Sequence, residues 1–425
     1  MKRVLCAILV LLLLSACSSK VPTRKVTVQA DVPGAGSSGP SIVRVLTLPG
    51  DPTLDVLISA YYGKYQNARV DKVTVTAGSS VVESFRQKLV DGAADVVPLY
   101  GGMNPWTAQL VQSSAVVALD PYIQKAKFNL SPLGSVAEQL RVDGHLYELP
   151  YLAPAPVIVY NLDMFTAAGL PFPKEGWTWD QFREAARKLT RGDGDGKVWG
   201  LSSVIVDALA QHWFYERSEN WRTDEKALRE GLQFFATLLF TDKALSPSVQ
   251  LGPSAVYRDD FWQGKAAMSL EYGGFASAGS FRNSKVKYGV APFPVHAGGK
   301  SMGIVLPYTM AVASNGQNLD AAWQFVSFAC GPEGALALAK AGYLPVYNTA
   351  DVRRAYADKQ PAPPPGHEAL FAVNWQVPPR AGDPLYPLEV RAEALINQVM
   401  SGAKDWENAV AEYLREAESL KPAKK

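Results

Sequence analysis

The sequence predicts an α/β protein, and three observations lead to that prediction. Residues 42–99 alternate β-branched runs with amphipathic runs in the order strand, helix, strand, helix, strand. Residues 147–190 place a short apolar strand, a glycine-containing turn and an amphipathic helix in succession. The chain closes with two amphipathic segments, residues 388–400 and 406–420. Strands that alternate with helices are typical of a mainly parallel sheet covered by helices, and we expect that arrangement here.

Five elements are expected before residue 100. The strand candidates are residues 42–48, 70–76 and 94–99, and the first helix candidate is residues 54–65. A second helix should begin at Ser80, because Ser80 and Glu83 have the spacing of a capping box, in which each side chain bonds the other residue's backbone.

The middle of the chain carries the most specific pattern. Val157 to Tyr160 is a run suited to a buried strand, and Gly169 with two nearby prolines punctuates the chain after it. Thr178 and Gln181 then stand at capping-box spacing. The apolar residues that follow recur at helical spacing, and they are Phe182, Ala185, Ala186 and Leu189. A core-facing helix should therefore start at this point.

The second half is expected to be mostly helical, with two strands. The strand candidates are residues 286–291 and 304–313. The helix candidates are residues 223–244, 319–329, 333–341, 388–400 and 406–420. Gly342 should end the helix before it, because glycine readily adopts the left-handed conformation found after helix ends.

The N-terminus has the features of a targeting segment. Lys2 and Arg3 precede an apolar run, and Leu14-Ser15-Ala16-Cys17 resembles the lipobox of bacterial lipoproteins. That resemblance implies a signal peptide at residues 1–16, a diacylglyceryl group on Cys17, and a flexible tether over residues 17–41. The alternative is an ordinary secretory signal in which the cysteine is a coincidence.

Composition and motifs argue against several classes of function. The formal net charge is +2 with acids and bases interspersed, which gives no indication of nucleic-acid binding. Cys330 is expected to be a small buried hydrophobe. The string from Gly34 to Gly39 has dinucleotide-fingerprint spacing but lies in the tether, and the four histidines have no zinc spacing. We therefore expect no enzyme activity, no cofactor and no metal.

The turn at residues 192–197 superficially suggests calcium. It contains Asp193 and Asp195 but lacks the flanking acids of a calcium loop, so we expect a structural turn in which the Asp side chains cap their own backbone. A secreted hydrolase with a spatially adjacent carboxylate pair remains an alternative, and Asp259-Asp260 is its sequence candidate.

Several segments together resemble one family. They are residues 147–190, 261–268, 288–294, 321–325 and 342–346. In order and spacing they are similar to the extracellular solute-binding proteins of ABC importers, specifically the sugar-binding, maltose-binding-like group called family 1. The resemblance runs from about Ile42 to Leu420.

The resemblance implies two discontinuous α/β lobes joined by hinge crossings, the periplasmic binding protein-like class II arrangement. Crossings are expected near residues 150–155, 291–294 and 329–345. Lobe 1 would contain residues 42–152 plus 293–332, and lobe 2 would contain residues 153–292 plus 333–425. A solute would lie in the cleft between the lobes.

Sugar recognition needs aromatic rings for the sugar faces and polar side chains for the hydroxyls. The first-lobe candidates follow a strand end, and they are Tyr100, Asn104 and Trp106. The second-lobe candidates are Glu271, Tyr272 and Phe275, because residues 268–275 resemble the family segment in which a strand ends in a polar residue and an aromatic one. The resemblance adds Tyr151, Asp207, Met302 and Trp375.

The sequence therefore predicts a lipid-anchored, extracytoplasmic receptor that captures a carbohydrate by hinge closure and delivers it to an ABC permease. We expect a monomer whose partners are a small solute, permease subunits and, through the lipid, a membrane. The alternatives are the same fold with a non-sugar solute, such as a glycerophosphodiester, a polyamine or an oligopeptide, and a secreted hydrolase.

Overall fold

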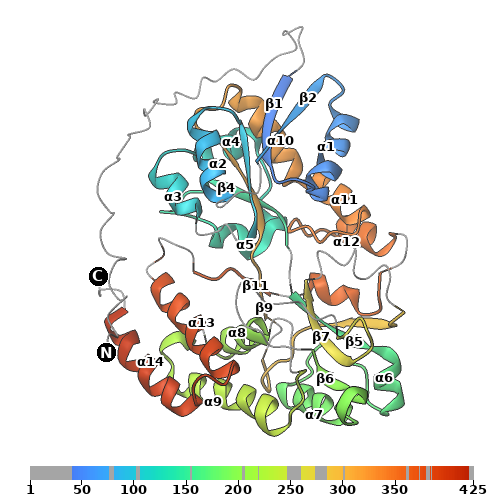
Figure 1. The fold of residues 1–425 in the computed structure, drawn as a ribbon. Helices are drawn as coiled ribbons and strands as arrows, with labels where there is room; N and C mark the ends of the chain where they lie inside the picture. Colours follow the sequence, from blue (N-terminus) through green and yellow to red (C-terminus); the bar gives the residue numbers. More distant parts are fainter. Residues whose placement is uncertain are drawn as a thin grey trace, which may run out of the picture.

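The computed structural model describes residues 41–75, 81–101, 106–153, 156–202, 206–218, 220–246, 260–272, 285–299, 302–359, 363–372, 374–379, 383 and 385–420. Figure 1 shows two halves, each built on its own sheet, which we call the first lobe and the second lobe. The α/β prediction is confirmed, as is the two-lobed arrangement. Cys17 and the lipobox lie outside the described residues.

The sheet of the first lobe has five strands in the order β2-β1-β3-β10-β4. Strand β1 (Ser41–Thr47) pairs in parallel with β2 (Ala68–Thr74) and with β3 (Val96–Leu99). Strand β10 (Tyr308–Val312) runs antiparallel to both β3 and β4 (Glu148–Leu152). The carboxyl ends of β1, β2, β3 and β4 therefore meet at one edge.

Helices cover both faces of this sheet. Val43 and Val45 of β1 face one core with α1 (Pro52–Lys64) and α10 (Leu319–Ala329), whereas Leu46 faces another core with α2 (Val81–Val90). This alternation follows from side chains pointing to opposite faces along a strand. Helices α3 (Trp106–Gln112), α4 (Asp120–Ala126) and α5 (Gly134–Gln139) complete the lobe.

The sheet of the second lobe has four strands in the order β6-β7-β5-β8. Strand β5 (Pro156–Asn161) pairs antiparallel with both β7 (Ala266–Tyr272) and β8 (Tyr288–Ala291), and β6 (Trp199–Leu201) pairs in parallel with β7. The parallel pairing expected from residues 42–99 is found for β1, β2 and β3, whereas in this lobe only β6 and β7 pair in parallel. Pairing direction depends on contacts distant in sequence, which local patterns do not report.

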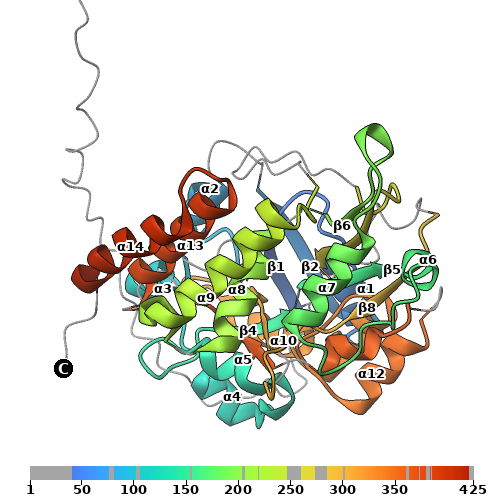
Figure 2. The ribbon, with the colours of Figure 1, turned by 90° about the horizontal axis from the view of Figure 1, so that it is seen from below.

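The helices of the second lobe are α6 (Leu162–Ala167), α7 (Trp179–Leu189), α8 (Val206–Arg217), α9 (Glu225–Ala236), α13 (Tyr386–Met400) and α14 (Trp406–Leu420). The capping box that starts α7 is confirmed, because Thr178 and Gln181 each bond the other residue's backbone. Helices α13 and α14 pack on each other and on α9. Viewed from below, α7 and α9 lie toward the viewer (Figure 2).

A buried ion pair fastens α13 to the second lobe. Arg222 pairs with Glu389 of α13, and their side chains are 5% and 3% exposed. The Tyr215 hydroxyl donates to Glu389 at 3.0 Å, and the Tyr413 hydroxyl donates to the Arg222 carbonyl at 2.8 Å. Burial raises the pKa of Glu389, and Arg222 opposes that rise.

The chain crosses between the lobes through short segments. Residues 153–155 join β4 to β5, close to the expected crossing near residues 150–155. The single strand expected at residues 304–313 is instead two strands, β9 (Met302–Ile304) and β10, separated by a segment that contains Pro307. Proline has no backbone N–H to donate to a ladder, so the chain can leave one sheet there before entering another.

Strand β9 does not join the first sheet. It pairs in parallel with β11 (Asn374–Gln376) and packs on α8 of the second lobe, while β11 packs on α5 of the first. Figure 1 shows this two-stranded ribbon between the two halves. We therefore propose that the second crossing lies at residues 305–307 and not at residues 291–294.

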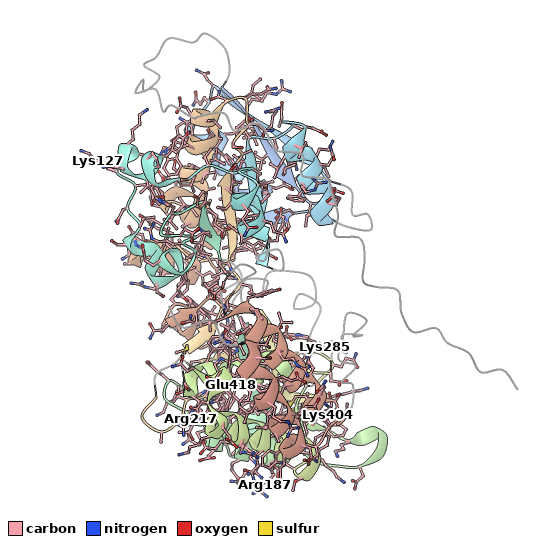
Figure 3. All side chains as sticks on the ribbon, turned by 90° about the vertical axis from the view of Figure 1, so that its left-hand side faces the viewer. Lys127, Arg187, Arg217, Lys285, Lys404 and Glu418 are labelled. Carbon is pink, nitrogen blue, oxygen red and sulfur yellow. The ribbon has the colours of Figure 1, made fainter. Side chains whose placement is uncertain are left out.

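The segment after residue 332 packs on the first lobe, where a boundary between the lobes was expected. Helix α11 (Pro332–Lys340) packs on α1, and Leu344 and Val346 bond the backbone of Ala153 and Tyr151. We propose that the first lobe continues through α11, and that α12 (Ala350–Ala357) lies at the junction. The side view in Figure 3 shows one lobe above the other, with Lys127 on the first and Arg187 and Arg217 on the second.

Candidate functional site

The first crossing joins an edge of one sheet to an edge of the other. Strand β4 ends at Leu152 and β5 begins at Pro156, so the carboxyl-end edge of the first sheet lies beside the start of β5. Tyr272 pairs with Pro156, which brings the end of β7 to the same place. Ligands of α/β proteins bind beyond the carboxyl ends of strands, and these two edges form the candidate site.

Tyrosines and one carboxylate form the first-lobe side of the site. Tyr100 follows β3, and its hydroxyl donates to Asp51 Oδ2 at 2.8 Å. Asp51 follows β1 and caps α1, accepting from the backbone N–H groups of Thr53 and Leu54. The Tyr308 ring lies edge-on to Tyr100, with centroids 5.1 Å apart, and 6.3 Å from the ring of Tyr151. The strand ends therefore bring together tyrosine hydroxyl donors, one carboxylate acceptor and aromatic rings.

Burial keeps these tyrosines protonated. It raises the pKa of Tyr100, and the nearby Asp51 carboxylate raises it further. Burial and then Asp51 act in the same direction on the pKa of Tyr308. Each hydroxyl is therefore a hydrogen-bond donor at neutral pH. The rings of Tyr100 and Tyr151 are 9% and 1% exposed, so in this conformation they support the edge from behind.

A carboxylate beside a tryptophan forms the second-lobe side. Glu271 Oε1, near the end of β7, accepts from Trp262 Nε1 at 3.1 Å and from Ser269 Oγ at 3.4 Å. The Trp262 ring is 5.0 Å from that of Tyr288. Burial raises the pKa of Tyr288, and the charge of Glu271 adds to that rise. Glu271 is partly exposed.

Two further candidates lie on the ribbon between the lobes. Met302 begins β9 and pairs with Asn374, and Trp375 is the central residue of β11. The Trp375 carbonyl accepts from Ser135 Oγ at 3.3 Å and from Gln139 Nε2 at 3.0 Å. A cavity of about 240 Å³ adjoins Trp375. Its polar lining comes from Ser131, Ser135, Asn348 and Asn374.

The structure thus brings Tyr100 and Tyr151 to one edge, Glu271 and the backbone of Tyr272 to the opposing edge, and Met302 and Trp375 to the ribbon. Asn104 and Phe275 lie outside the described residues. Trp106 begins α3 and Asp207 is in the first turn of α8, but their side chains, like that of Tyr272, lie outside the described part.

Sequence reasoning missed three site residues. Asp51 carries the signal of a helix cap, which it also is, and this concealed its place at the end of β1. Trp262 lies in the segment at residues 261–268 that carries the resemblance, but no binding role was expected for it, and Tyr308 was expected only to lie within a longer strand. Two buried hydroxyls near the same edges, Tyr151 Oη and Ser202 Oγ, have no hydrogen-bond partner. Ser202 directly follows β6.

Within the described residues, no group of three or more His, Cys, Asp or Glu side chains is placed to hold a metal ion. The turn at residues 192–197 contains a short 3₁₀ helix (Gly194–Gly196) whose cap residue is Asp193. The expectation that Asp193 caps this backbone through its side chain is wrong, because that carboxylate makes no capping bond. In the part of the chain that the structure describes, no helix combines the length and the hydropathy needed to cross a membrane.

Comparison with known proteins gives concordant results. A family model described as bacterial extracellular solute-binding protein matches residues 47–336. The chain is 32% identical over 121 residues to a mannitol-binding protein from Pseudomonas aeruginosa, covering 25% of this chain and 27% of that one. It is 24% identical over 256 residues to an sn-glycerol-3-phosphate-binding periplasmic protein from Brucella abortus, covering 57% and 55%. The chain spans about half the length, or less, of the curated relatives it matches.

Among solved structures, the chain is similar to a sugar transporter from Rhizobium etli in an open conformation. The TM-score is 0.75 at 25% identity, over 89% of this chain and 99% of that one. The ABC substrate-binding protein from Listeria monocytogenes in complex with cycloalternan gives a TM-score of 0.70 at 20% identity, over 89% and 98%. Both comparisons agree with two lobes of this topology.

Proposed function

This chain belongs to the bacterial extracellular solute-binding protein family, and from that premise we propose that it captures a carbohydrate between its lobes and delivers it to an ABC permease. The observation that carries the proposal is that two strand-end regions, which the first crossing joins, each hold a carboxylate beside aromatic rings. One presents Asp51 with its tyrosines, and the other presents Glu271 with Trp262. Carboxylates beside aromatic rings suit a polyol, because the carboxylates accept hydroxyl protons while rings stack on C–H faces.

Hinge closure would supply the affinity. A closed form is favoured only when the solute contacts both lobes more strongly than water does, and the crossings at residues 153–155 and 305–307 are short enough to act as hinges. The residues proposed to contact the solute are Tyr100, Asn104, Trp106, Tyr151, Asp207, Glu271, Tyr272, Phe275, Met302 and Trp375. Asp51, Trp262 and Tyr308 join them on the geometry described above. No covalent step is part of this function.

A neutral solute fits the described edges better than an anion does. Asp51 and Glu271 are both acidic and lie on opposite edges, so a phosphate placed between them would meet like charge from two sides. The mannitol-binding and sugar-transporter relatives support a neutral polyol, whereas the sn-glycerol-3-phosphate-binding relative keeps a phosphate ester as an alternative solute. Mono- and oligosaccharides are therefore the first class to test.

The site of action would be the outer face of a membrane. The lipobox-like string ending at Cys17 supports a thioether-linked lipid, and residues 17–41 would let the lobes reach a permease. The receptor would act as a monomer.

A thermal-shift screen followed by calorimetry tests the proposal. A solute at a hundred times its Kd stabilises the folded state by about 2.7 kcal/mol, which a melting curve resolves readily. We expect a sugar or sugar alcohol to raise the melting temperature and to bind at one site per chain without being consumed. If only phosphodiesters, polyamines or peptides stabilise the protein, the carbohydrate assignment is wrong. Release of a cleaved product would instead support the hydrolase.

A further inference from the structure

The ribbon between the lobes has two strands among the described residues, so β11 has one edge paired with β9 and one outer edge. Successive residues of a strand direct their backbone groups to opposite edges. The backbone N–H of Val305 donates to the Gln376 carbonyl at 2.9 Å, which places the backbone groups of Gln376 on the β9 side. The backbone groups of Trp375 and Val377 therefore face the outer edge.

One side chain of the first lobe bonds both of these outer groups. Gln139 is the last residue of α5, and its Nε2 donates to the Trp375 carbonyl at 3.0 Å. Its Oε1 accepts from the Val377 N–H at 2.9 Å. A neighbouring strand would make the same pair of bonds, so the Gln139 side chain substitutes for a third strand at this point. We call these two bonds the Gln139 clamp.

The partners of Gln139 require a primary amide. Nε2 donates to two carbonyls, those of Trp375 and Ser135, the second at 3.2 Å. A reversed amide, or a carboxylate, would place an oxygen against both carbonyl oxygens. Val377 is 6% exposed and precedes Pro378, which has no backbone N–H, so the loss of the acceptor at Val377 is not made good by the next residue.

The Gln139 clamp lies where the two lobes meet. Helix α5 belongs to the first lobe, whereas β9, on the other side of β11, packs on α8 of the second lobe. Trp375 pairs with Gly303, next to Met302. The clamp supplies two of the three described hydrogen bonds between α5 and residues 375–377, and the third comes from Ser135 Oγ at 3.3 Å. The strand that carries Trp375 is thus held by a backbone ladder on one edge and by side chains on the other.

We propose that Gln139 is a positioning residue whose amide, acting as one rung of a strand, fixes Trp375 relative to both lobes. The role of Trp375 as a solute contact rests on the proposed function, and the clamp adds the residue that holds Trp375 in place before a solute binds. A side chain that is already ordered loses less conformational freedom on binding and so contributes more to affinity. Because the clamp bonds backbone atoms, it persists whatever side chain stands at position 375.

Hydrogen exchange of the full chain, measured by mass spectrometry, tests the bond to Val377. Gln139→Met removes the amide but keeps the length and the helix propensity of the side chain. We expect protection in a peptide that contains Val377 to fall about three- to tenfold, while β5 keeps its protection. Gln87→Met is the matched control, because Gln87 bonds only Asp91 on the exposed side of α2, at 2.8 Å, and it should behave as the parent. Unchanged protection at Val377 in Gln139→Met would overturn the clamp.

Fluorine NMR of the chain labelled with 5-fluorotryptophan tests the position of the Trp375 ring without a solute. The chain has ten tryptophans, and the signal of Trp375 is the one that disappears in Trp375→Phe. We expect Gln139→Met to shift or broaden that signal and to leave the signal of Trp221, in the second-lobe core, unchanged. Gln139→Glu should act in the same way, because a carboxylate cannot donate to the Trp375 carbonyl. An identical Trp375 signal in Gln139→Met and the parent would show that Gln139 does not position the ring.

Calorimetry with mannitol as the probe connects the clamp to the proposed function. Gln139→Met should weaken binding about three- to tenfold, and that loss should vanish in a Trp375→Ala background, where the backbone bonds remain but the ring is absent. An equal loss in both backgrounds would show that Gln139 acts on the fold and not through Trp375, and would overturn the proposal. If the parent does not bind mannitol, the result counts against the solute assignment, whereas exchange and NMR still decide the clamp.

Discussion

Gly101 is the position where a single methyl group should disturb the first-lobe edge most. It directly follows Tyr100 after β3 and precedes the loop that leads to α3. A Cβ atom at Gly101 would lie 2.6 Å from the Leu306 carbonyl oxygen and 2.9 Å from Leu306 Cβ. Leu306 lies in the crossing between β9 and β10, so Gly101→Ala would push the binding loop and the crossing apart.

The size of the effect follows from these distances. Ordinary contact begins at 3.4 Å, and moving from 2.6 Å to that value requires a displacement of about 0.8 Å. The obstructing atom belongs to the backbone, so it cannot rotate away. Overpacking of this kind costs about 1–3 kcal/mol. Each kcal/mol lowers the melting temperature by about 1 °C in a chain of 425 residues, because the unfolding entropy is about 2.1 cal/mol/K per residue. Solute affinity should fall too, because Gly101 directly follows Tyr100, a proposed solute contact.

Gly63→Ala is the matched control. Gly63 lies near the end of α1, and a Cβ atom there would have no neighbour within 4 Å. Alanine is favoured over glycine in a helix by about 0.5–1 kcal/mol, so this variant should be unchanged or slightly more stable. Urea denaturation followed by tryptophan fluorescence measures both variants. If Gly101→Ala has the same midpoint and the same solute affinity as the parent, the close approach to Leu306 does not constrain the edge.

Four further predictions follow from other sites. Asp95→Asn should lower the free energy of unfolding by about 3 kcal/mol, because Asp95 is buried and accepts from Arg44 and from the backbone of Gln317. Burial alone would raise the pKa of Asp95, but these bonds outweigh it and lower that pKa. Their contribution is therefore present above about pH 4 and lost below it, and acid titration of unfolding should be flatter in the variant. Glu271→Ala and Tyr272→Ala should each weaken solute binding ten- to a hundredfold, or about 1–3 kcal/mol by calorimetry, and unchanged affinity in both would misplace the cleft. Cys17→Ser should leave the chain unlipidated, and a native N-terminus other than a modified Cys17 in mass spectrometry would contradict the anchor. Calorimetry should show no micromolar calcium binding at the Asp193 turn, whereas an Asp193-dependent signal would reverse that expectation.

Local signals made the helices predictable. The helix expected at residues 319–329 matches α10, and its cap bond comes from Asn318, directly before the helix. Gly342 follows the end of α11 with a φ of 87°, a conformation that glycine adopts without strain. Such signals lie within a few residues of the element they define, so one sequence suffices to read them.

The pairing of strands was not predictable in the same way. β7 and β8 pair antiparallel with β5, and both are far from β5 along the chain. The residues within a strand do not indicate which strand it will pair with. In the candidate site, too, local features were predictable from the sequence and long-range contacts were not. Tyr100 and Glu271 stand at strand ends that the sequence marks, whereas the bonds from Tyr100 to Asp51 and from Trp262 to Glu271 join residues that only folding brings together.

The junction between the lobes couples these parts physically. Ala153, in the first crossing, donates to the Leu344 carbonyl at 2.9 Å, and Gly101 packs against Leu306 of the second crossing. Each crossing is thus held by a segment distant in sequence. A rotation of one lobe would therefore have to change the backbone at both crossings. Contacts made by a solute at Glu271 alone leave the first lobe unconstrained, and contacts at the Tyr100 edge alone leave the second lobe free. A closed state is therefore favoured only when one molecule reaches both edges, because only then does binding distinguish the closed arrangement from the open one.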